Sequence, residues 1–265
     1  RRSLASLAAT WRRLRGRRFR FAVDFQGLFK SALAASAAHP DRIYGFHQSQ
    51  AREPIAALFY SNRVRATSRH VVDCDIELAA AAGASAIVKA FPLPPGTAEG
   101  ALPEGGFVLA SPAAGWPAKE WPLEYYSRLA SLVARRLGMP LVLNGPPDAA
   151  SVLGSVQGAL VHLSGIPGLI HATRRAAAVI GIDSGPLHLA AALEKPGVAV
   201  FGPTDPERNG PYGTTFTVLR SPEAATSYKR RRETDSSMRA VTPEMVAQAL
   251  EERLAAGRSR GASIS

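Results

Sequence analysis

The chain has 265 residues, 46% of them hydrophobic, and a formal net charge of +11 at pH 7. This length and apolar content can form one large or two modest globular domains with a buried core. The single cysteine, Cys74, excludes an intramolecular disulfide and a cysteine-rich metal site, a pattern typical of a reducing cytoplasm. No apolar run approaches the roughly 18–20 residues needed to span a bilayer, and no signal-peptide core is found.

The positive charge is concentrated in the first 23 residues, which hold eight arginines and no acidic residue. Without those eight charges of the +11, the other 242 residues carry only +3, which argues against a uniformly basic nucleic-acid-binding protein. We interpret the arginine run as a solvated helix face, with contact to an anionic membrane surface as the alternative. No recognition motif or interleaved aromatic residue accompanies it, so no nucleic-acid partner is expected.

The first third of the chain is predicted to alternate helices and strands before a segment rich in proline and glycine. Residue spacing predicts a helix over 4–15, a strand over 19–25, and helices over 28–38, 51–60 and 77–82. Residues 91–106 hold four prolines and four glycines, which interrupt regular structure. We therefore expect a linker here, with an N-terminal domain over 1–95 and a C-terminal domain over 96–256.

After the linker, short apolar strands alternate regularly with helices. The predicted strands cover 107–111, 141–144, 162–164, 178–182 and 197–201, and the helices cover 123–137, 149–157, 167–177, 186–193 and 242–254. Such alternation predicts an α/β fold with a parallel sheet covered by helices on both faces. Residues 257–265 are predicted to form a disordered tail.

The segment Val179–Leu193, VIGIDSGPLHLAAAL, combines a strand, a tight turn and a helix opened by Pro186, a residue favoured at the first helical position. The free N–H groups and the dipole of such a helix attract phosphate, and Gly185 lets a ligand approach the backbone. His188 follows in the first turn. We expect a site for the diphosphate of a nucleotide or nucleotide-sugar, with an unliganded strand–turn–helix unit as the alternative. Ser184 stands one place late for a serine-hydrolase elbow.

Four other segments hold polar or aromatic residues, and three of them follow predicted strands, where α/β proteins bind ligands. They read VDFQGLFKSA over 23–32, SQAREPIAALFY over 49–60, KEWP over 119–122 and FGPTDPERNGPYG over 201–213. In this order, together with Val179–Leu193, they resemble glycosyltransferase family 9, and within it most closely the lipopolysaccharide heptosyltransferase I branch. The resemblance extends over roughly residues 10–256.

The resemblance implies a GT-B fold with two Rossmann-like domains and parallel sheets, the N-terminal one incomplete. It implies inverting transfer of L-glycero-D-manno-heptose from ADP-heptose to Kdo of Kdo2-lipid A, in lipopolysaccharide biosynthesis at the cytoplasmic face of the bacterial inner membrane. The C-terminal domain would bind the sugar donor and the N-terminal domain the acceptor. Two alternatives stay open: a heptosyltransferase II-type enzyme that adds a second heptose, and a donor-binding chain with little turnover.

The expected donor-binding residues come from the last three segments of the match, and they are Lys119, Asp183, Ser184, Gly185, His188 and Thr204. Ser184 and Gly185 are suited to the diphosphate, and His188 can donate a hydrogen bond as charge develops on the departing ADP. The resemblance assigns Lys119 to sugar-donor binding, where its ammonium offsets negative charge. Asp183 has the wrong sign for phosphate, so we assign it to sugar hydroxyls or to the helix cap.

On the acceptor side, Gln26, Lys30 and Arg52 suit an anionic sugar, because arginine can bind a carboxylate or phosphate through two hydrogen bonds. The family opens with a strand and a loop like Ser-Ser-Leu-Gly-Asp, whose aspartate is the proposed general base. This sequence lacks that segment, so we expect a truncated form of a longer protein. Inverting transfer needs a base on the acceptor side, and Asp24 is the candidate that the sequence offers.

No cofactor or metal ion is expected from the sequence. It shows no cluster of metal-ligand residues, and a lysine, a histidine and backbone N–H groups can offset a diphosphate without a metal. Trp116 and Trp121, which flank Lys119, are interpreted as packing residues rather than as stacking surfaces for a ligand.

Overall fold

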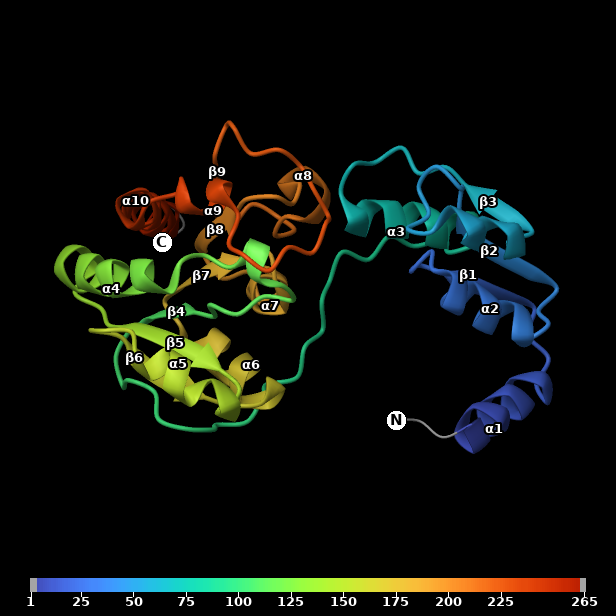
Figure 1. The fold of residues 1–265 in the computed structure, drawn as a ribbon, viewed down its shortest axis with the longest axis horizontal. Helices are drawn as coiled ribbons and strands as arrows, with labels where there is room; N and C mark the ends of the chain where they lie inside the picture. Colours follow the sequence, from blue (N-terminus) through green and yellow to red (C-terminus); the bar gives the residue numbers. More distant parts are fainter. Residues whose placement is uncertain (1–3, 263–265) are drawn as a thin grey trace. The chain divides into compact units, whose positions relative to one another are not determined.

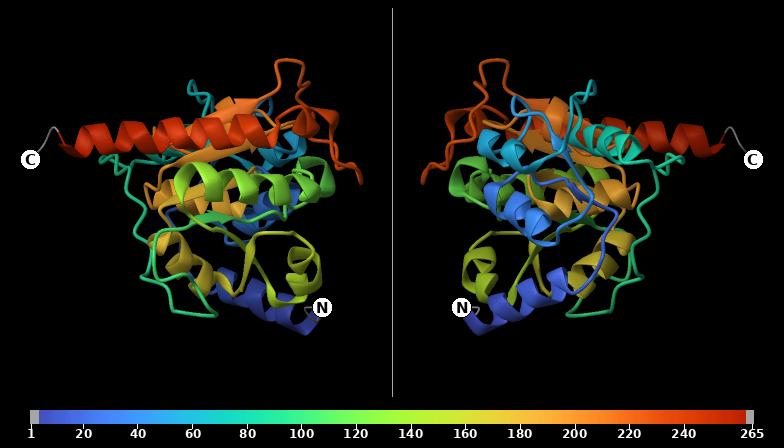
Figure 2. Two further views of the ribbon diagram at one scale, coloured as in Figure 1. Left: turned by 90° about the vertical axis from the view of Figure 1, so that its left-hand side faces the viewer. Right: turned by 90° about the vertical axis from the view of Figure 1, so that its right-hand side faces the viewer.

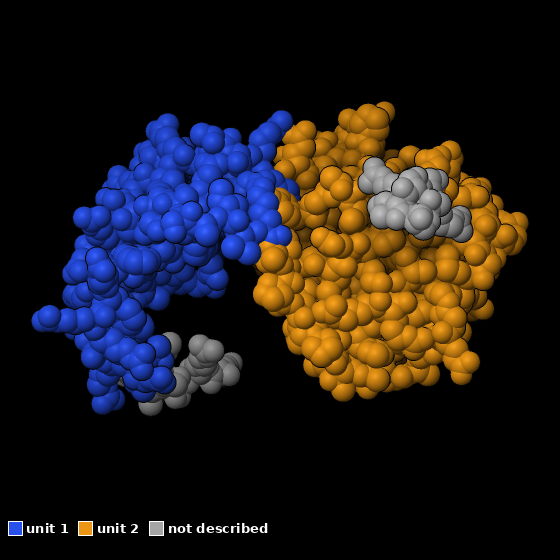
Figure 3. Space-filling model, turned by 180° about the vertical axis from the view of Figure 1, so that it is seen from behind, with its two compact units in different colours: residues 1–89 blue, residues 90–265 orange. Residues whose placement is uncertain are grey.

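The computed structural model describes residues 4–262, and the chain divides into two compact units, residues 1–89 and 90–265 (Figures 1 and 3). The sequence placed this boundary after residue 95, whereas the division falls after Lys89. The reason is that the proline-rich segment is bound to unit 2: the Arg174 guanidinium donates hydrogen bonds to the carbonyls of Leu93 and Pro94, and the Thr97 N–H donates to the Pro167 carbonyl.

Unit 1 contains a three-stranded parallel sheet in the order β1-β2-β3. Its strands are β1 (Phe21–Asp24), β2 (Arg42–Phe46) and β3 (Asn62–Val64), and its helices are α1 (Leu4–Arg15), α2 (Phe29–Ala37), the 3₁₀ helix η1 (Pro54–Phe59) and α3 (Val71–Ala81). Successive side chains of a strand point to opposite faces. Ile43 accordingly packs in one apolar cluster with Tyr60, while Tyr44 packs in another with Leu78.

Unit 2 is built on a six-stranded parallel sheet in the order β6-β5-β4-β7-β8-β9. The strands are β4 (Val108–Ala110), β5 (Leu141–Gly145), β6 (Leu160–Leu163), β7 (Ala178–Ile182), β8 (Gly197–Phe201) and β9 (Phe216–Arg220). The chain forms β4 in the middle of the sheet, adds β5 and β6 on one side, and then adds β7, β8 and β9 on the other. This is the strand order of a dinucleotide-binding Rossmann fold. Ligands of such sheets bind outside the carboxyl ends of the strands where the order reverses, here between β4 and β7.

Helices cover both faces of this sheet. They are the 3₁₀ helices η2 (Pro117–Lys119) and η3 (Pro147–Ala149), and α4 (Leu123–Leu137), α5 (Ala150–Gly154), α6 (Ile166–Arg175), α7 (Gly185–Ala192), α8 (Pro206–Asn209), α9 (Ser236–Arg239) and α10 (Pro243–Ala262). The long helices α4 and α10 lie side by side (Figure 2) and pack in one apolar cluster, while α6 and α7 contribute to the cluster on the other face.

The core of unit 2 follows from alternation along its strands. In β4, Val108 and Ala110 point to the α4–α10 side, while Leu109 points to the α6–α7 side, and all three are at most 1% exposed. Each strand buried on both faces therefore reads as a continuous apolar run rather than as an alternating one. This is why the sequence reveals the central strands of unit 2 so clearly.

The predicted α/β class, with two parallel-sheet units, is confirmed. The short strands β2, β3 and β9 were not predicted from the sequence. In β2, Gly45 interrupts the apolar pattern, but a Cβ at this position would collide with the Tyr60 ring, so only glycine fits. Residues 51–60 were predicted to be an α-helix and form the shorter η1 instead, because Pro54 has no N–H to extend a helix backwards.

The C-terminal tail also differs from the expectation. Disorder was predicted from Gly257, but α10 continues through this glycine to Ala262, while residues 263–265 lie outside the described part of the chain. Alanine and arginine favour helix on either side of Gly257 and outweigh its unfavourable propensity. Among residues 4–262, no helix has both the length and the apolarity needed to cross a membrane.

We predict that Gly181→Ala destabilises unit 2. A Cβ at residue 181 in β7 would lie 2.9 Å from the Leu187 Cβ and 3.3 Å from its Cα, so α7 would have to move away from the sheet. We expect the free energy of unfolding, measured by urea denaturation with tryptophan fluorescence, to fall by about 1–3 kcal/mol. Gly154→Ala in α5 is the matched control, because no atom lies within 4 Å of its added Cβ. Equal losses in both variants would contradict this account.

Candidate functional site

The turn after β7 has the geometry of an anion site. β7 ends at Ile182, and α7 begins at Gly185 with a proline in its first turn. Ser184 is the N-cap residue, and its side chain makes no capping hydrogen bond. A Cβ at residue 185 would meet no atom within 4 Å, so a ligand can approach the first N–H groups of the helix, which have no partner inside it.

Lys119 and Asp183 form a buried ion pair beside this turn. The Lys119 Nζ lies 2.9 Å from the Asp183 Oδ2, and each residue is 8% exposed. The His188 Nε2 lies 3.7 Å from the Asp183 Oδ1, while the His188 side chain itself is 45% exposed. One carboxylate thus holds an ammonium and an imidazole at the mouth of α7. The ammonium supplies a positive charge there, and the partly exposed imidazole supplies a ring nitrogen that can hydrogen-bond to an anion.

The balance of charge keeps Asp183 ionised. Burial by itself raises the pKa of Asp183, but the neighbouring His188 and Lys119 outweigh this effect and leave the pKa below its ordinary value. A buried carboxylate without such partners would bind a proton instead. The ammonium and imidazole groups are therefore held in place by a negative charge that persists at neutral pH.

Two buried polar groups near the ion pair have no hydrogen-bond partner among the described residues. They are the hydroxyl of Ser184 and the indole N–H of Trp116. A buried polar group without a partner costs folding free energy, and a bound ligand can supply the missing bond. The sequence predicted Ser184 and Thr204 as site residues: Ser184 directly follows Asp183 in the chain, and the Thr204 hydroxyl helps to lower the pKa of the Asp183 carboxyl.

Trp116 and Arg230 belong to the same cluster and were not predicted as site residues. The Lys119 Nζ lies 4.0 Å from the centre of the Trp116 ring, and the Arg230 guanidinium carbon lies 5.4 Å from it. Arg230 comes from a basic stretch, residues 229–232, whose chain is held here by the hydrogen bond from the Asp235 N–H to the Ala118 carbonyl. The four consecutive basic residues were the available signal in the sequence.

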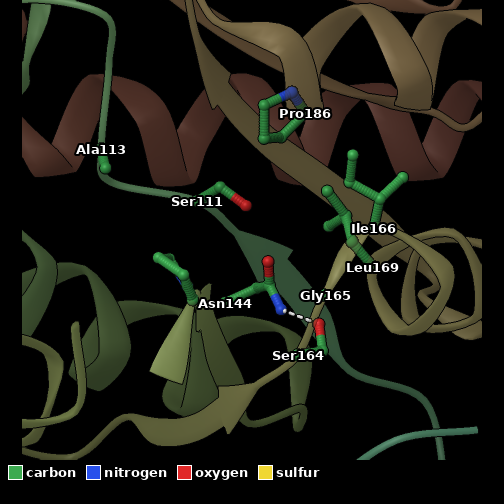
Figure 4. A pocket seen from close by; sticks show the side chains of 10 residues that line it. Ser111, Ala113, Asn144, Ser164, Gly165, Ile166, Leu169 and Pro186 are labelled. Atoms are coloured by element: carbon green, nitrogen blue, oxygen red, sulfur yellow. Dashed lines mark hydrogen bonds between the residues drawn. The ribbon is translucent and has the colours of Figure 1, made fainter. Parts of the chain in front are cut away.

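A pocket of about 240 Å³ opens at the carboxyl ends of β4, β5 and β6, next to the start of α7 (Figure 4). Ser111, Asn144 and Ser164 supply polar atoms, and the walls include Pro146, Ile166, Leu169 and Pro186. Pro186 is also the first-turn residue of the anion site. The pocket and the ion pair therefore lie at the same edge of the sheet, where the strand order reverses.

In unit 1, Asp24 is engaged by the protein itself. Its Oδ1 accepts from the N–H groups of Gln26 and Gly27 at 3.0 and 3.3 Å. Its Oδ2 lies 2.8 Å from the Ser31 hydroxyl and accepts from the Tyr60 hydroxyl at 2.6 Å. Burial and this bond to Asp24 raise the pKa of Tyr60, which keeps its hydroxyl protonated. With both oxygens occupied and 5% exposure, Asp24 fixes the turn between β1 and α2.

The three predicted acceptor residues are exposed and belong to neighbouring segments of unit 1. The Glu53 N–H donates to the Gly27 carbonyl, and a Cβ at Gly27 would lie 3.0 Å from the Arg52 nitrogen, so the backbones around Gln26 and Arg52 touch. Lys30 follows in the first turn of α2. Among residues 4–262, no group of three or more histidine, cysteine or acidic side chains is arranged to hold a metal ion.

Asp183→Asn is predicted to lower stability in a pH-dependent way. Since the pKa of Asp183 is lowered on folding, its ion pair stabilises the protein above the ordinary value of 3.8, and this stabilisation is lost as the pH falls through the lowered value. We expect the free energy of unfolding of Asp183→Asn to be about 3 kcal/mol below the unchanged protein at pH 7. In acid the difference shrinks. Asp148→Asn, in the exposed 3₁₀ helix η3, is the control, and a deficit for Asp183→Asn that persists at about pH 2 would refute the ion-pair argument.

The chain is similar in sequence to known proteins. The sequence pattern of glycosyltransferase family 9 (heptosyltransferase) matches residues 7–239. Lipopolysaccharide heptosyltransferase 1 of Pseudomonas aeruginosa is 29% identical over 230 residues, covering 80% of this chain and 63% of the relative. Lipooligosaccharide heptosyltransferase 2 of Haemophilus influenzae is 32% identical over 154 residues, covering 52% of this chain and 44% of the relative. The first of these matches thus spans less than two thirds of the relative's own length.

The fold is similar to that of a solved heptosyltransferase. The structure of E. coli heptosyltransferase WaaC with ADP has a TM-score of 0.71 and 27% sequence identity, and the likeness covers 95% of this chain and 79% of that one. This confirms the GT-B fold class that the resemblance implied. Because the family pattern matches residues 7–239, which is most of the chain, the chain belongs to glycosyltransferase family 9, the heptosyltransferase family.

Proposed function

We propose that this chain binds ADP-heptose through unit 2 and transfers L-glycero-D-manno-heptose, with inversion, to Kdo of Kdo2-lipid A. The observation that carries this proposal is the Lys119–Asp183–His188 cluster at the start of α7. It joins fixed positive charge to an open helix N-terminus, which is the combination that a diphosphate requires. The solved relative named with ADP has the same fold.

Each residue of the cluster has a role in this proposal. The diphosphate lies over Gly185, where its oxygens accept from the N–H groups of the first turn of α7. Lys119 and His188 offset its charge, and His188 donates a hydrogen bond as negative charge grows on the departing ADP. Asp183 keeps both groups in position, and its remaining acceptor capacity suits hydroxyls of the heptose. Thr204 and Ser184 supply hydroxyl groups to the same space.

The reaction is proposed to proceed without a metal ion. In an inverting transfer, the leaving diphosphate must be stabilised, and a divalent cation is one means of doing so. Lys119, His188 and the positive end of α7 supply an equivalent charge from the protein. Arg230, beside Trp116, is a further cation within reach of the same site.

The acceptor is proposed to bind unit 1. Gln26, Lys30 and Arg52 are exposed and have donor groups that suit the carboxylate of Kdo.

Each of two alternative functions is favoured by one observation. The match to a heptosyltransferase 2 favours addition of a second heptose. Both carboxylate oxygens of Asp24 already take part in hydrogen bonds within unit 1, which disfavours Asp24 as the catalytic base. This observation favours the second alternative, a chain that binds the sugar donor with little turnover.

A lipid acceptor would bring the chain to the cytoplasmic face of the inner membrane, and we propose that α1 contacts the anionic surface there. Arg12, Arg13 and Arg15 are exposed on this helix. The full chain should cosediment with vesicles containing anionic lipid and much less with neutral ones. Replacing the three arginines by glutamine should weaken the binding, whereas Arg135→Gln on α4 should not. Equal binding to both kinds of vesicle would argue against an electrostatic contact.

His188→Ala and Lys119→Met are predicted to weaken ADP binding. Each removes one charge-assisted contact to the diphosphate, so we expect the dissociation constant, measured by calorimetry, to rise at least about tenfold. His171→Ala on α6 is the matched control and should bind ADP as the unchanged chain does. Unchanged affinity in both site variants would show that ADP does not bind at this cluster.

Transfer itself is tested by mass spectrometry of the lipid after incubation with ADP-heptose. We expect the mass of one heptose to be added to Kdo2-lipid A, at a rate that EDTA does not change. Addition only to an acceptor that already carries heptose would support the second-heptose alternative. ADP binding with no transfer to either acceptor would support the chain with little turnover. A rate lost in EDTA and restored by Mg²⁺ would refute metal independence.

A further inference from the structure

The pocket beside the anion site contains one buried side chain with an unused hydrogen-bonding atom. Asn144, at the carboxyl end of β5, is 6% exposed. Its amide nitrogen is within hydrogen-bond distance of three acceptors: His162 Nδ1 at 3.0 Å, the His162 carbonyl at 3.2 Å and the Ser164 hydroxyl at 2.8 Å. Among the described residues no group donates to its Oδ1, which points into the pocket (Figure 4).

The orientation of this amide is fixed by its partners. If the amide were turned over, its oxygen would face the carbonyl oxygen of His162, and neither atom has a hydrogen to share. The ring of His162 is fixed in the same way. Its Nε2 lies 2.6 Å from the Glu99 carbonyl, which only accepts, so the proton is on Nε2 and Nδ1 is left to accept from Asn144. His162 is 1% exposed, so this chain of bonds is shielded from water.

Ser164 adds the complementary group. Its hydroxyl accepts from the Asn144 amide, so its own proton is available to an acceptor in the pocket. The pocket thus presents an acceptor and a donor side by side between apolar walls formed in part by Pro146, Ile166 and Leu169. A flat heteroaromatic ring with a donor next to an acceptor on its edge fits this pattern.

Among nucleobases, the pattern distinguishes two groups. On the edge that carries atoms 1 and 6 of a purine, adenine presents an exocyclic amino group next to a ring nitrogen that accepts, a pattern that cytosine shares, whereas hypoxanthine and guanine present a carbonyl oxygen next to a ring N–H, as does uracil. For the second group, the base carbonyl would face the Asn144 Oδ1, whereas the Ser164 hydroxyl can rotate and either donate or accept. The amide of fixed orientation rejects such a ligand, because two facing acceptors are left unpaired.

We propose that Asn144 selects the base of the sugar donor, its Oδ1 accepting a hydrogen bond from the exocyclic amino group of adenine. This inference rests on the proposed binding of an ADP-sugar by unit 2 and assigns the choice of base to one residue. Glu99 and His162 hold the amide in the selective orientation. The Lys119–Asp183–His188 cluster binds the diphosphate and has no part in that choice.

The test is a calorimetric series with the full chain and four nucleotides: ADP, inosine diphosphate, guanosine diphosphate and 2′-deoxy-ADP. We expect the unchanged chain to bind ADP at least about tenfold more tightly than inosine diphosphate or guanosine diphosphate. 2′-Deoxy-ADP should bind nearly as tightly as ADP. Asn144→Leu, similar in size, should reduce the ADP-to-inosine diphosphate ratio to within about threefold. Ile166→Ala is the control, since loss of a wall contact should weaken all four nucleotides and leave the ratio unchanged.

Three outcomes would overturn the proposal. One is a ratio that survives in Asn144→Leu. Another is a clear preference of the unchanged chain for ADP over 2′-deoxy-ADP that Asn144→Leu abolishes, because Asn144 would then bind the ribose. The third is that the unchanged chain binds the nucleotides without preference. This result does not depend on whether Asn144→Leu folds, and it leaves the proposed function standing. A folded chain that binds no nucleoside diphosphate would overturn the proposed function together with this inference.

Discussion

The contact between Lys119 and Asp183 is the constraint on which the rest of the site depends. Lys119 belongs to the segment that follows β4, and Asp183 to the turn that follows β7, yet their charged atoms lie 2.9 Å apart. Removing two charges from water costs several kcal/mol for each ion and is offset only when the contact is close. This contact therefore requires three features at the same time. β4 and β7 must be neighbours in the sheet, the chain must follow its path past Trp116, and α7 must begin where it does.

The two buried aspartates show how the same residue type can serve structure or ligand binding. Asp24 has donors on both oxygens, all from its own unit, and nothing is left over for another molecule. Asp183 instead pairs with the Lys119 ammonium and lies 3.7 Å from the partly exposed His188 ring, and the neighbouring buried hydroxyl of Ser184 has no partner among the described residues. A polar group that the fold satisfies completely contributes to stability. A cluster that is left partly unsatisfied is arranged for a ligand.

The site of unit 2 divides into two parts with different chemistry along one edge of the sheet. Near α7 it is cationic and partly open to water, which suits a diphosphate whose charge changes during transfer. Near β5 and β6 it is a mostly apolar pocket, with one amide of fixed orientation, that of Asn144. In a surrounding of low polarity, one correctly oriented hydrogen bond discriminates strongly between ligands, because the wrong ligand finds no water to replace it. Affinity and selectivity are thus assigned to different strands of the same sheet.

The sequence by itself determined the fold class and the family, and it located the strand–turn–helix unit at the start of α7. Continuous apolar runs marked the doubly covered strands of unit 2, and Pro186 with Gly185 marked the start of α7, because these signals are local in the chain. The sequence could not show that Asp183 pairs with Lys119, that Asp24 is occupied by Tyr60 and Ser31, or that Asn144 and Arg230 lie at the site. Each of these depends on residues far apart in sequence, whose contact is set by strand order and helix packing. Only the tertiary structure decided them, since hydrogen bonds and ion pairs depend on distances that the residue pattern does not contain.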